Sequence, residues 1–324
     1  MLKLLIVKTS SLGDVIHNLP IIADICVHFP NIQIDWLVEE SFADIPKLHP
    51  KVNQVITVAV RRWRKALFTT SSLYSATWHE MKSAKHKIAQ TQYDMVLDTQ
   101  GLLKSGLMAS FANGVKHGYH QDSIREPLAS YFYDVKHQVL LKQHAVTRNR
   151  AIAASALGYA TPDHAPHYGI TASEPTIRFN QDYIIGLHGT SRDSKLWPTE
   201  YWVSLGRALE TQKLDLLLPW ASDAELSRAQ YIARQLNNAV VLPKCTIAEL
   251  ASVIHQANAA IGVDTGLSHL AVALSRPTIA LYTDTNPALT GVCAGAFAPA
   301  INLGNINKIP SVDDVMSTLD IILN

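Results

Sequence analysis

Residues 8–14, Lys-Thr-Ser-Ser-Leu-Gly-Asp, carry side chains suited to acid–base chemistry. They follow an apolar run and precede apolar residues at helical spacing, which predicts a strand-to-helix turn with Asp14 in the first helical turn. Such turns line the ligand crevice of an open parallel sheet, and a helix N-terminus favours an ionised carboxylate. Asp14 is therefore a candidate general base toward an acceptor hydroxyl, or it serves only the helix start. We expect His17 to be packed, and the single glycine excludes a dinucleotide fingerprint and a Walker A loop.

A second candidate site is a run of cations directly after an expected strand. Arg61, Arg62, Arg64 and Lys65 fall within five residues. Guanidinium groups match the geometry of phosphate and carboxylate, so the run predicts anion binding, with a solvated basic face or loop as the alternative. Nucleic acid is disfavoured because the chain has no helix-turn-helix, RNA-recognition or zinc-finger pattern and a pI of only about 7.8.

Two loops in the second half have the groups that bind a diphosphate. The first contains Thr190, Ser191 and Lys195, which supply hydroxyls and a cation. The second, residues 264–269, reads Asp-Thr-Gly-Leu-Ser-His and opens a helix whose N-terminal amides suit a pyrophosphate. Both follow strands of one expected sheet, so we expect them to converge. Asp264 as a helix N-cap and His269 as a core histidine are the alternatives, and the α/β surroundings exclude an aspartic protease.

Short apolar runs alternate with amphipathic stretches, the pattern of parallel strands connected by helices. A proline-containing break at 158–175 suggests an α/β protein with domains 1–165 and 182–324 joined by a linker at 166–181, and a ligand cleft between the domains. We expect that the last helix can pack back on the first domain. The predicted strands are 4–7, 34–38, 55–58, 95–98, 183–187, 215–218, 239–242, 259–263 and 278–282. The predicted helices are 15–29, 143–157, 199–211, 223–236, 246–256 and 266–275.

Composition restricts the class of protein. The chain has 324 residues, 48% hydrophobic and 17% charged, with a net charge of +1, so a basic site must be local. The three cysteines, Cys26, Cys245 and Cys293, form no CxxC pair, which predicts neither a disulfide framework nor a zinc ribbon. The sequence lacks metal-ligand spacing, a signal peptide and an apolar run of the ~18 residues that span a bilayer. We therefore expect a cytoplasmic protein that requires no metal or other cofactor.

Four segments carry a resemblance to a known family. They are Val-Lys-Thr-Ser-Ser-Leu-Gly-Asp at 7–14, Arg-Arg-Trp-Arg-Lys-Ala at 61–66, Arg-Glu-Pro-Leu-Ala-Ser at 125–130 and Val-Asp-Thr-Gly-Leu-Ser-His-Leu at 263–270. From its start to about residue 290, the chain resembles the lipopolysaccharide heptosyltransferases of Gram-negative bacteria. The last segment marks the whole family, and the second points to the heptosyltransferase I group.

The resemblance implies a GT-B glycosyltransferase, with two Rossmann-like domains facing across a central cleft. The first domain would bind the acceptor and the second ADP-heptose. The reaction would transfer L-glycero-D-manno-heptose, with inversion, to the 3-deoxy-D-manno-octulosonic acid (Kdo) of Kdo-lipid A in lipopolysaccharide inner-core synthesis. We also expect peripheral contact with the cytoplasmic face of the inner membrane, a monomer, and no nucleic-acid partner. A later heptosyltransferase of the pathway (heptosyltransferase II-like), a sugar-nucleotide epimerase and a non-catalytic anion- or nucleic-acid-binding protein are the alternatives.

The same resemblance implies a role for each site residue. Asp14 would be the base, and Lys195 would support the leaving diphosphate. The donor-binding residues would be Thr190, Ser191, Lys195, Thr265 and Gly266 on the diphosphate, Asp264 on the heptose, Glu225 on the ribose, Cys245 on the adenine through its backbone, and His269 at the nucleotide end. The acceptor-binding residues would be Arg61, Arg62, Arg64, Lys65 and Arg125. Ser191 and Cys245 replace the family's usual threonine and methionine, and residues 284–287 depart from its pattern, so no site residue is assigned there.

Overall fold

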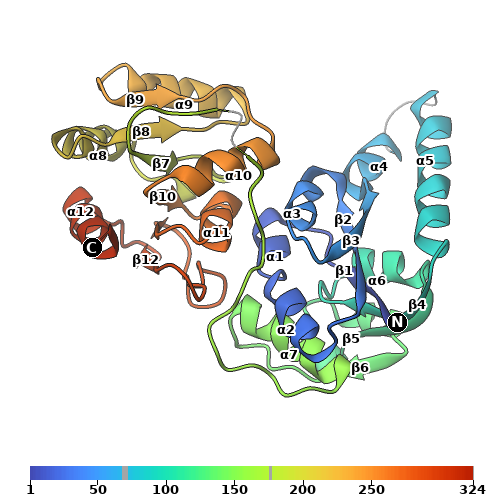
Figure 1. Ribbon diagram of the computed structural model, residues 1–324. Helices are drawn as coiled ribbons and strands as arrows, with labels where there is room; N and C mark the ends of the chain where they lie inside the picture. Colours follow the sequence, from blue (N-terminus) through green and yellow to red (C-terminus); the bar gives the residue numbers. More distant parts are fainter. Residues whose placement is uncertain (68–71, 175–176, 324) are drawn as a thin grey trace. The chain divides into compact units, whose positions relative to one another are not determined.

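The computed structural model describes residues 1–67, 72–174 and 177–323 (Figure 1). The chain divides into two compact units, Met1–His164 and Ala165–Asn324. Each unit contains one six-stranded parallel sheet with helices between its strands, so the predicted α/β class with two Rossmann-like domains is confirmed. The segment 166–181, expected as a linker, begins the second unit, and its residues 175 and 176 lie outside the described part of the chain.

The sheet of the first unit has the strand order β3-β2-β1-β4-β5-β6. Strand order reverses between the central strands β1 and β4, and such a switch point is where open α/β sheets bind ligands. The four predicted strands are present, whereas β5 and β6 were not predicted. The bounds are β1 Lys3–Val7, β2 Gln33–Glu39, β3 Val52–Val58, β4 Gln92–Asp98, β5 Asn113–Tyr119 and β6 Val135–His137.

The predicted single helix at 15–29 is wrong. The structure has two helices there, because Pro20 lacks an N–H group and starts a new helix. The predicted helix at 143–157 is present and ends at Gly158, which has the left-handed backbone conformation expected after a helix. The helices of this unit are α1 Leu12–Ile16, α2 Pro20–His28, α3 Asp44–Lys47, α4 Val60–Leu67, α5 Ser72–Ala89, α6 Leu103–Ser110 and α7 Ala145–Leu157, with the 3₁₀ turns η1 Glu40–Phe42, η2 Gln121–Ser123 and η3 Pro127–Phe132.

The sheet of the second unit has the order β12-β11-β10-β7-β8-β9. All five predicted strands and all four predicted helices are present, with ends that differ by up to three residues, and β12 was not predicted. The strands are β7 Tyr183–Leu187, β8 Asp215–Leu218, β9 Ala239–Val241, β10 Ala259–Val263, β11 Thr278–Tyr282 and β12 Ala300–Gly304. The helices are α8 Thr199–Thr211, α9 Asp223–Ala233, α10 Ile247–Gln256, α11 Gly266–Ala273 and α12 Val312–Leu323, with the 3₁₀ turn η4 Asp193–Lys195.

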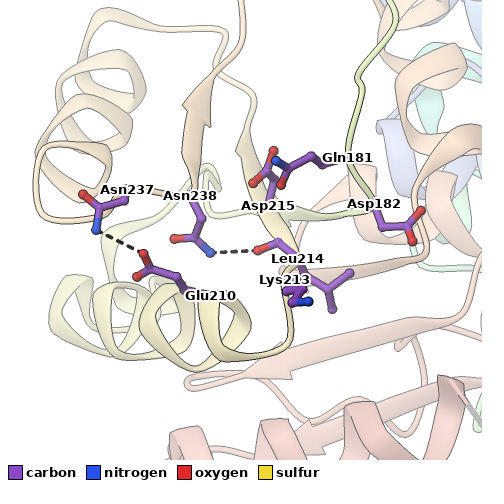
Figure 2. A pocket seen from close by; sticks show the side chains of 8 residues that line it. All are labelled: Gln181, Asp182, Glu210, Lys213, Leu214, Asp215, Asn237 and Asn238. Atoms are coloured by element: carbon purple, nitrogen blue, oxygen red, sulfur yellow. Dashed lines mark hydrogen bonds between the residues drawn. The ribbon is translucent and has the colours of Figure 1, made fainter.

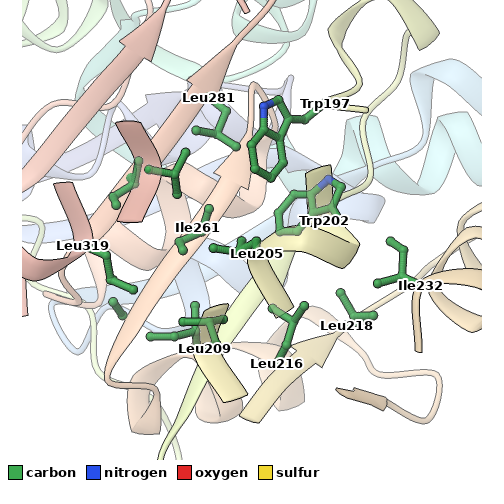
Figure 3. Close-up of a cluster of buried hydrophobic side chains, with 14 of the residues drawn as sticks. Trp197, Trp202, Leu205, Leu209, Leu216, Leu218, Ile232, Ile261, Leu281 and Leu319 are labelled. Carbon is green, nitrogen blue, oxygen red and sulfur yellow. The ribbon is translucent and has the colours of Figure 1, made fainter. Parts of the chain in front are cut away.

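A buried apolar cluster holds the second sheet against its helices (Figure 3). Trp197 and Trp202 are fully buried and pack edge to face, with ring centroids 5.2 Å apart. The Trp197 indole N–H also donates to the Pro310 carbonyl at 2.9 Å, which anchors the chain two residues after Lys195.

The last helix, α12, belongs to the same core. Its Val315, Leu319 and Ile322 are buried in the cluster, and the helix packs on α8 and β11. Its buried apolar face is therefore used within the second unit, and packing of this helix on the first domain stays a prediction. No helix in the described part of the chain combines the length and apolar character needed to cross a bilayer.

Candidate active site

The loop after β1 carries Asp14 and is fixed by hydrogen bonds at its start and at its end. The Gln100 Oε1 atom, in the loop after β4, accepts from the amides of Thr9 and Ser10 at 3.0 and 3.1 Å. The Asp14 Oδ2 atom accepts from the Ser11 amide at 2.7 Å and from the Ser11 hydroxyl at 2.9 Å. Asp14 therefore lies in the first turn of α1, as predicted, and it also stabilises the helix start.

Two other side chains of this region are buried. His17 is 2% exposed and packs edge-on against His144, so the prediction of a packed histidine is confirmed. The Lys8 Nζ atom donates to the Thr99 carbonyl at 2.8 Å. Burial lowers the pKa of Lys8, while the nearby Asp14 carboxylate acts in the opposite direction. Lys8 is thus an interior cation close to the candidate base.

Lys104 is a candidate site residue that the sequence analysis missed. It lies in the first turn of α6, and its Nζ donates to the Ser10 hydroxyl at 2.6 Å. The side chain is half-buried, and burial is the main cause of its lowered pKa, followed by the positive charge of Arg61. The rule that led to Asp14, inspection of loops at the carboxyl ends of strands, would have found Lys104 if applied to β4.

The predicted cation run lies on helix α4, not on a loop. Trp63 is buried in the core, so the helix is fixed to the sheet through one face. The Arg62 guanidinium donates to both carboxylate oxygens of Glu40 at 3.0 Å, and to those of Glu80 at 2.8 and 2.6 Å. These hydrogen bonds, that with Glu40 first, raise the pKa of Arg62. Arg62 is therefore already paired within this unit.

The other predicted acceptor-binding residues lie at or near the surface. The Arg61 amide donates to Glu39 Oε1 at 3.0 Å, and its guanidinium lies 5.2 Å from the centre of the Phe42 ring. Three further cations have exposed side chains: Arg64, Lys65 and Arg125. These groups are accessible to an anionic ligand.

In the second unit the two predicted diphosphate loops converge. They follow the adjacent strands β7 and β10. The Thr190 hydroxyl donates to the Asp264 carbonyl at 2.9 Å, and Lys195 Nζ lies 2.6 Å from Asp264 Oδ2. The side chains of this ion pair are only 15% and 17% exposed, so it is much less screened than a surface pair. The predicted convergence is confirmed.

The alternative role of Asp264 as a helix cap is wrong, because Thr265 occupies the N-cap position of α11. Asp264 Oδ2 instead accepts from the Thr285 hydroxyl at 2.6 Å. Thr285 follows the next strand, β11, and was not predicted. It lies in the segment that departs from the family pattern, so only strand-end logic could have found it.

The three residues predicted to contact the nucleoside lie near helix starts. Glu225 belongs to the capping box of α9, where its Oε2 accepts from the Ala221 amide at 2.7 Å. A Cβ atom added to Gly189 would lie 2.5 Å from Glu225 Oε1, so the glycine permits close approach of the β7 loop. Cys245 precedes the N-cap of α10 and is half-buried. His269 is 7% exposed on α11, which agrees with a core position and leaves its nucleotide role a prediction.

The remaining predicted donor residues differ in exposure. Ser191 is exposed, and Gly266 is half-buried as the first residue of α11. The β10–α11 turn is tight: Ser268 Oγ donates to the Val263 carbonyl at 2.8 Å, and a Cβ atom on Gly262 would meet that hydroxyl oxygen. This packing explains a glycine at position 262 and fixes where α11 begins.

A surface pocket lies at the other edge of the second sheet (Figure 2). It is lined by polar residues at the amino ends of the strands, including Asp182 before β7 and Asp215 at the start of β8. None of the predicted site residues lines it. Within residues 1–67, 72–174 and 177–323, no group of three or more His, Cys, Asp or Glu side chains is arranged to hold a metal, and the three cysteines are free.

The family model, the related sequences and the solved structure that this chain resembles all name heptosyltransferases. The family model described as glycosyltransferase family 9 (heptosyltransferase) matches residues 81–317. Lipopolysaccharide heptosyltransferase 1 of Pseudomonas aeruginosa is 44% identical over 292 residues, which cover 90% of this chain and 81% of the relative. Lipopolysaccharide heptosyltransferase 1 of Escherichia coli K12 is 42% identical over 319 residues, 95% and 97% of the two chains. The solved structure of E. coli heptosyltransferase WaaC with ADP has a TM-score of 0.90 at 39% identity and covers 98% of this chain and 99% of that one.

The two parallel-sheet units have GT-B architecture, and the family model and these relatives show that the chain is a glycosyltransferase. Within that class the chain belongs to glycosyltransferase family 9, the heptosyltransferases. The predicted enzyme class and family are therefore confirmed.

Proposed function

We propose that this enzyme transfers L-glycero-D-manno-heptose from ADP-heptose to the Kdo of Kdo-lipid A in lipopolysaccharide inner-core synthesis. The observation that carries the proposal is its 42–44% identity, over at least 90% of the chain, to the lipopolysaccharide heptosyltransferases 1 of two bacteria. The loops of the second unit support it, because Thr190, Lys195 and the start of α11 supply hydrogen-bond donors and positive charge for a diphosphate.

In the proposed step, a hydroxyl oxygen of Kdo attacks the anomeric carbon of heptose. The bond from that carbon to the diphosphate oxygen breaks, and ADP leaves with the electron pair. Asp14 takes the proton of the attacking hydroxyl. Because that oxygen attacks from the side opposite the leaving diphosphate, the new glycosidic bond forms with inversion. Lys195 and the N-terminus of α11 stabilise the negative charge that develops on the diphosphate. Since protein groups balance this charge, we expect EDTA to leave the rate unchanged.

The cations of the first unit suit the anionic acceptor. Arg61, Arg64, Lys65 and Arg125 present positive charge at or near the surface, and a phosphorylated sugar-acid acceptor carries complementary negative charge. Arg62 keeps α4 in place through its two carboxylate partners, and its half-exposed guanidinium adds to the same positive surface.

The acceptor is a lipid, so we propose a cytoplasmic enzyme in peripheral contact with the inner membrane, acting as a monomer. Flotation with vesicles that contain Kdo-lipid A tests the first part, and light scattering in solution tests the second. Recovery of the protein only in the unbound fraction, or a mass of two or more chains, would contradict these statements separately.

In the decisive experiment, the purified protein is incubated with ADP-heptose and Kdo-lipid A, and the molecular mass of the product is measured. We expect the acceptor to gain one heptosyl residue as ADP is released. Transfer only to an acceptor that already carries the first heptose would instead indicate a later heptosyltransferase. Conversion of the nucleotide sugar without an acceptor would indicate an epimerase. Failure to release ADP, with salt-sensitive binding to DNA or RNA, would indicate a non-catalytic binding protein.

A further inference from the structure

Lys104 and Asp14 are connected through two consecutive serines. The Lys104 ammonium donates to the hydroxyl of Ser10, and the amide and hydroxyl of Ser11 donate to the Asp14 carboxylate. The same loop is tied to the chain after β4 by Gln100, so the segment that carries Asp14 and the start of α6 are held together. The ammonium therefore has a defined position on the loop that carries the proposed base.

The hydrogen-bonding capacity of this ammonium is largely unused. Lysine has three N–H donors, and within the described chain the Lys104 ammonium makes one hydrogen bond, to a neutral hydroxyl, and no ion pair. Half-burial removes part of its hydration, a cost that a neighbouring anion would offset. Glu39, Asp14 and Glu126 act on Lys104 through longer-range attraction.

Other cations of this unit differ from Lys104. Arg62 is saturated by two glutamates, and Lys8 is buried against a backbone carbonyl. Arg61 is the cation whose repulsion acts most strongly on Lys104. In the described chain no carboxylate contacts the Lys104 ammonium directly, and Arg61 adds positive charge nearby, so both groups can contribute to binding an anion.

We propose that Lys104 binds the carboxylate of the acceptor sugar acid and thereby positions the attacking hydroxyl beside Asp14. This inference rests on the proposed function and extends it, because it assigns one acceptor group to one residue. A carboxylate fits because its two oxygens can accept the unused N–H donors of one ammonium. A phosphate on the lipid part of the acceptor shares this chemistry, so the test must separate the two.

The test is a cycle that changes the enzyme and the acceptor in turn. Initial rates are measured for wild type, Lys104→Met and Lys104→Arg with Kdo-lipid A, with its Kdo carboxamide, and with an acceptor that lacks the lipid phosphates. Lys51→Met is the matched control, since Lys51 is exposed and precedes β3 at the opposite, amino edge of the same sheet. Thermal unfolding of each variant monitors folding.

We expect Lys104→Met to lower kcat/KM for Kdo-lipid A by about 10- to 100-fold, the range for a lost charge-assisted hydrogen bond. With the carboxamide, wild type and Lys104→Met should differ by less than about threefold, because the interaction is already absent. Removing the lipid phosphates should leave the effect of the mutation unchanged. Lys104→Arg should recover part of the rate, and Lys51→Met should behave as wild type.

Equal losses from Lys104→Met with both the carboxylate and the carboxamide would overturn the inference. So would a mutational effect that disappears only with the dephosphorylated acceptor, which would indicate a phosphate ligand. If Lys104→Met does not fold, the same comparison with Lys104→Arg decides, because replacing the ammonium by a guanidinium should change the rate only with the carboxylate acceptor. A wild-type protein that transfers no heptose overturns the proposed function, whereas an active wild type with a fully active Lys104→Met overturns this inference alone.

Discussion

Replacing Asp14 by alanine tests its proposed role as the base, once the effect on the start of α1 is accounted for. The carboxylate accepts hydrogen bonds from the Ser11 amide at 2.7 Å and hydroxyl at 2.9 Å, so Asp14→Ala removes a helix cap as well as the proposed base. Loss of a cap costs about 1 kcal/mol and lowers Tm by about 2–4 °C in a unit of this size. Loss of a general base lowers kcat by about 10²–10⁴-fold, or about 3–5 kcal/mol of barrier. We therefore expect a large fall in kcat, a small fall in Tm and little change in KM.

Asp314 provides a matched control for this experiment. At the start of α12 its Oδ2 accepts from the Ser311 amide at 3.0 Å and from the Ser311 hydroxyl at 2.7 Å, the arrangement found at Asp14. Asp314→Ala should lower Tm by a similar small amount and leave kcat within about twofold of wild type. Initial rates at 25 °C and thermal unfolding of both variants give the comparison. Equal kcat values for the two alanine variants would refute the assignment of Asp14 as the base.

Three further predictions concern charge and stability. Asp24→Asn should lower the free energy of unfolding by about 3–5 kcal/mol in denaturant titration, because it removes the charged partner of Arg150, which lies 2.7 Å from Asp24 and is also buried; a loss below about 1 kcal/mol would contradict this. Burial lowers the pKa of His188 to about 4, so the unfolded chain takes up the proton first as the pH falls, and stability should drop by about 3 kcal/mol between pH 6.5 and 4. His188→Gln should lose that part of the pH dependence, and an unchanged slope would argue against it. Arg61→Glu combined with Arg64→Glu should raise the acceptor KM at least about tenfold and leave the ADP-heptose KM unaltered, and steady-state kinetics that show the reverse pattern would exclude acceptor binding there.

Strands that read as apolar runs were predictable, and strands of mixed polarity were not. A central parallel strand such as β1 or β10 is covered on both faces and reads as a continuous apolar run. In contrast, β5 contains two glycines, a lysine and a histidine, and β6 has three residues, two of them exposed. Pairing with a neighbouring strand makes these segments extended, and local sequence does not report that pairing.

Site residues on strand-end loops were predictable, but their partners were not. Asp14, Lys195 and Asp264 each follow a recognisable strand. The rule for open α/β sheets therefore predicts that they lie at the carboxyl edge of their sheet, where ligands bind. The hydrogen bond from Lys104 to Ser10 spans 94 residues of sequence, and it depends on β1 and β4 being neighbours. Thr285 reaches Asp264 across a similar junction between adjacent strands. Only the strand order brings these groups together.

Lys195 of the second unit and Lys104 of the first unit differ in how completely each is paired within the chain. Lys195 already contacts the Asp264 carboxylate, so a diphosphate at Lys195 brings negative charge close to that carboxylate. The Thr285 hydroxyl offsets part of this repulsion, and hydroxyl groups of a bound sugar can offset more. In the proposed reaction, the donor sugar would therefore stabilise its own diphosphate site, and ADP without the sugar would lose that contribution. Lys104 lacks such a carboxylate, so an acceptor anion there would add an attraction without displacing an internal partner.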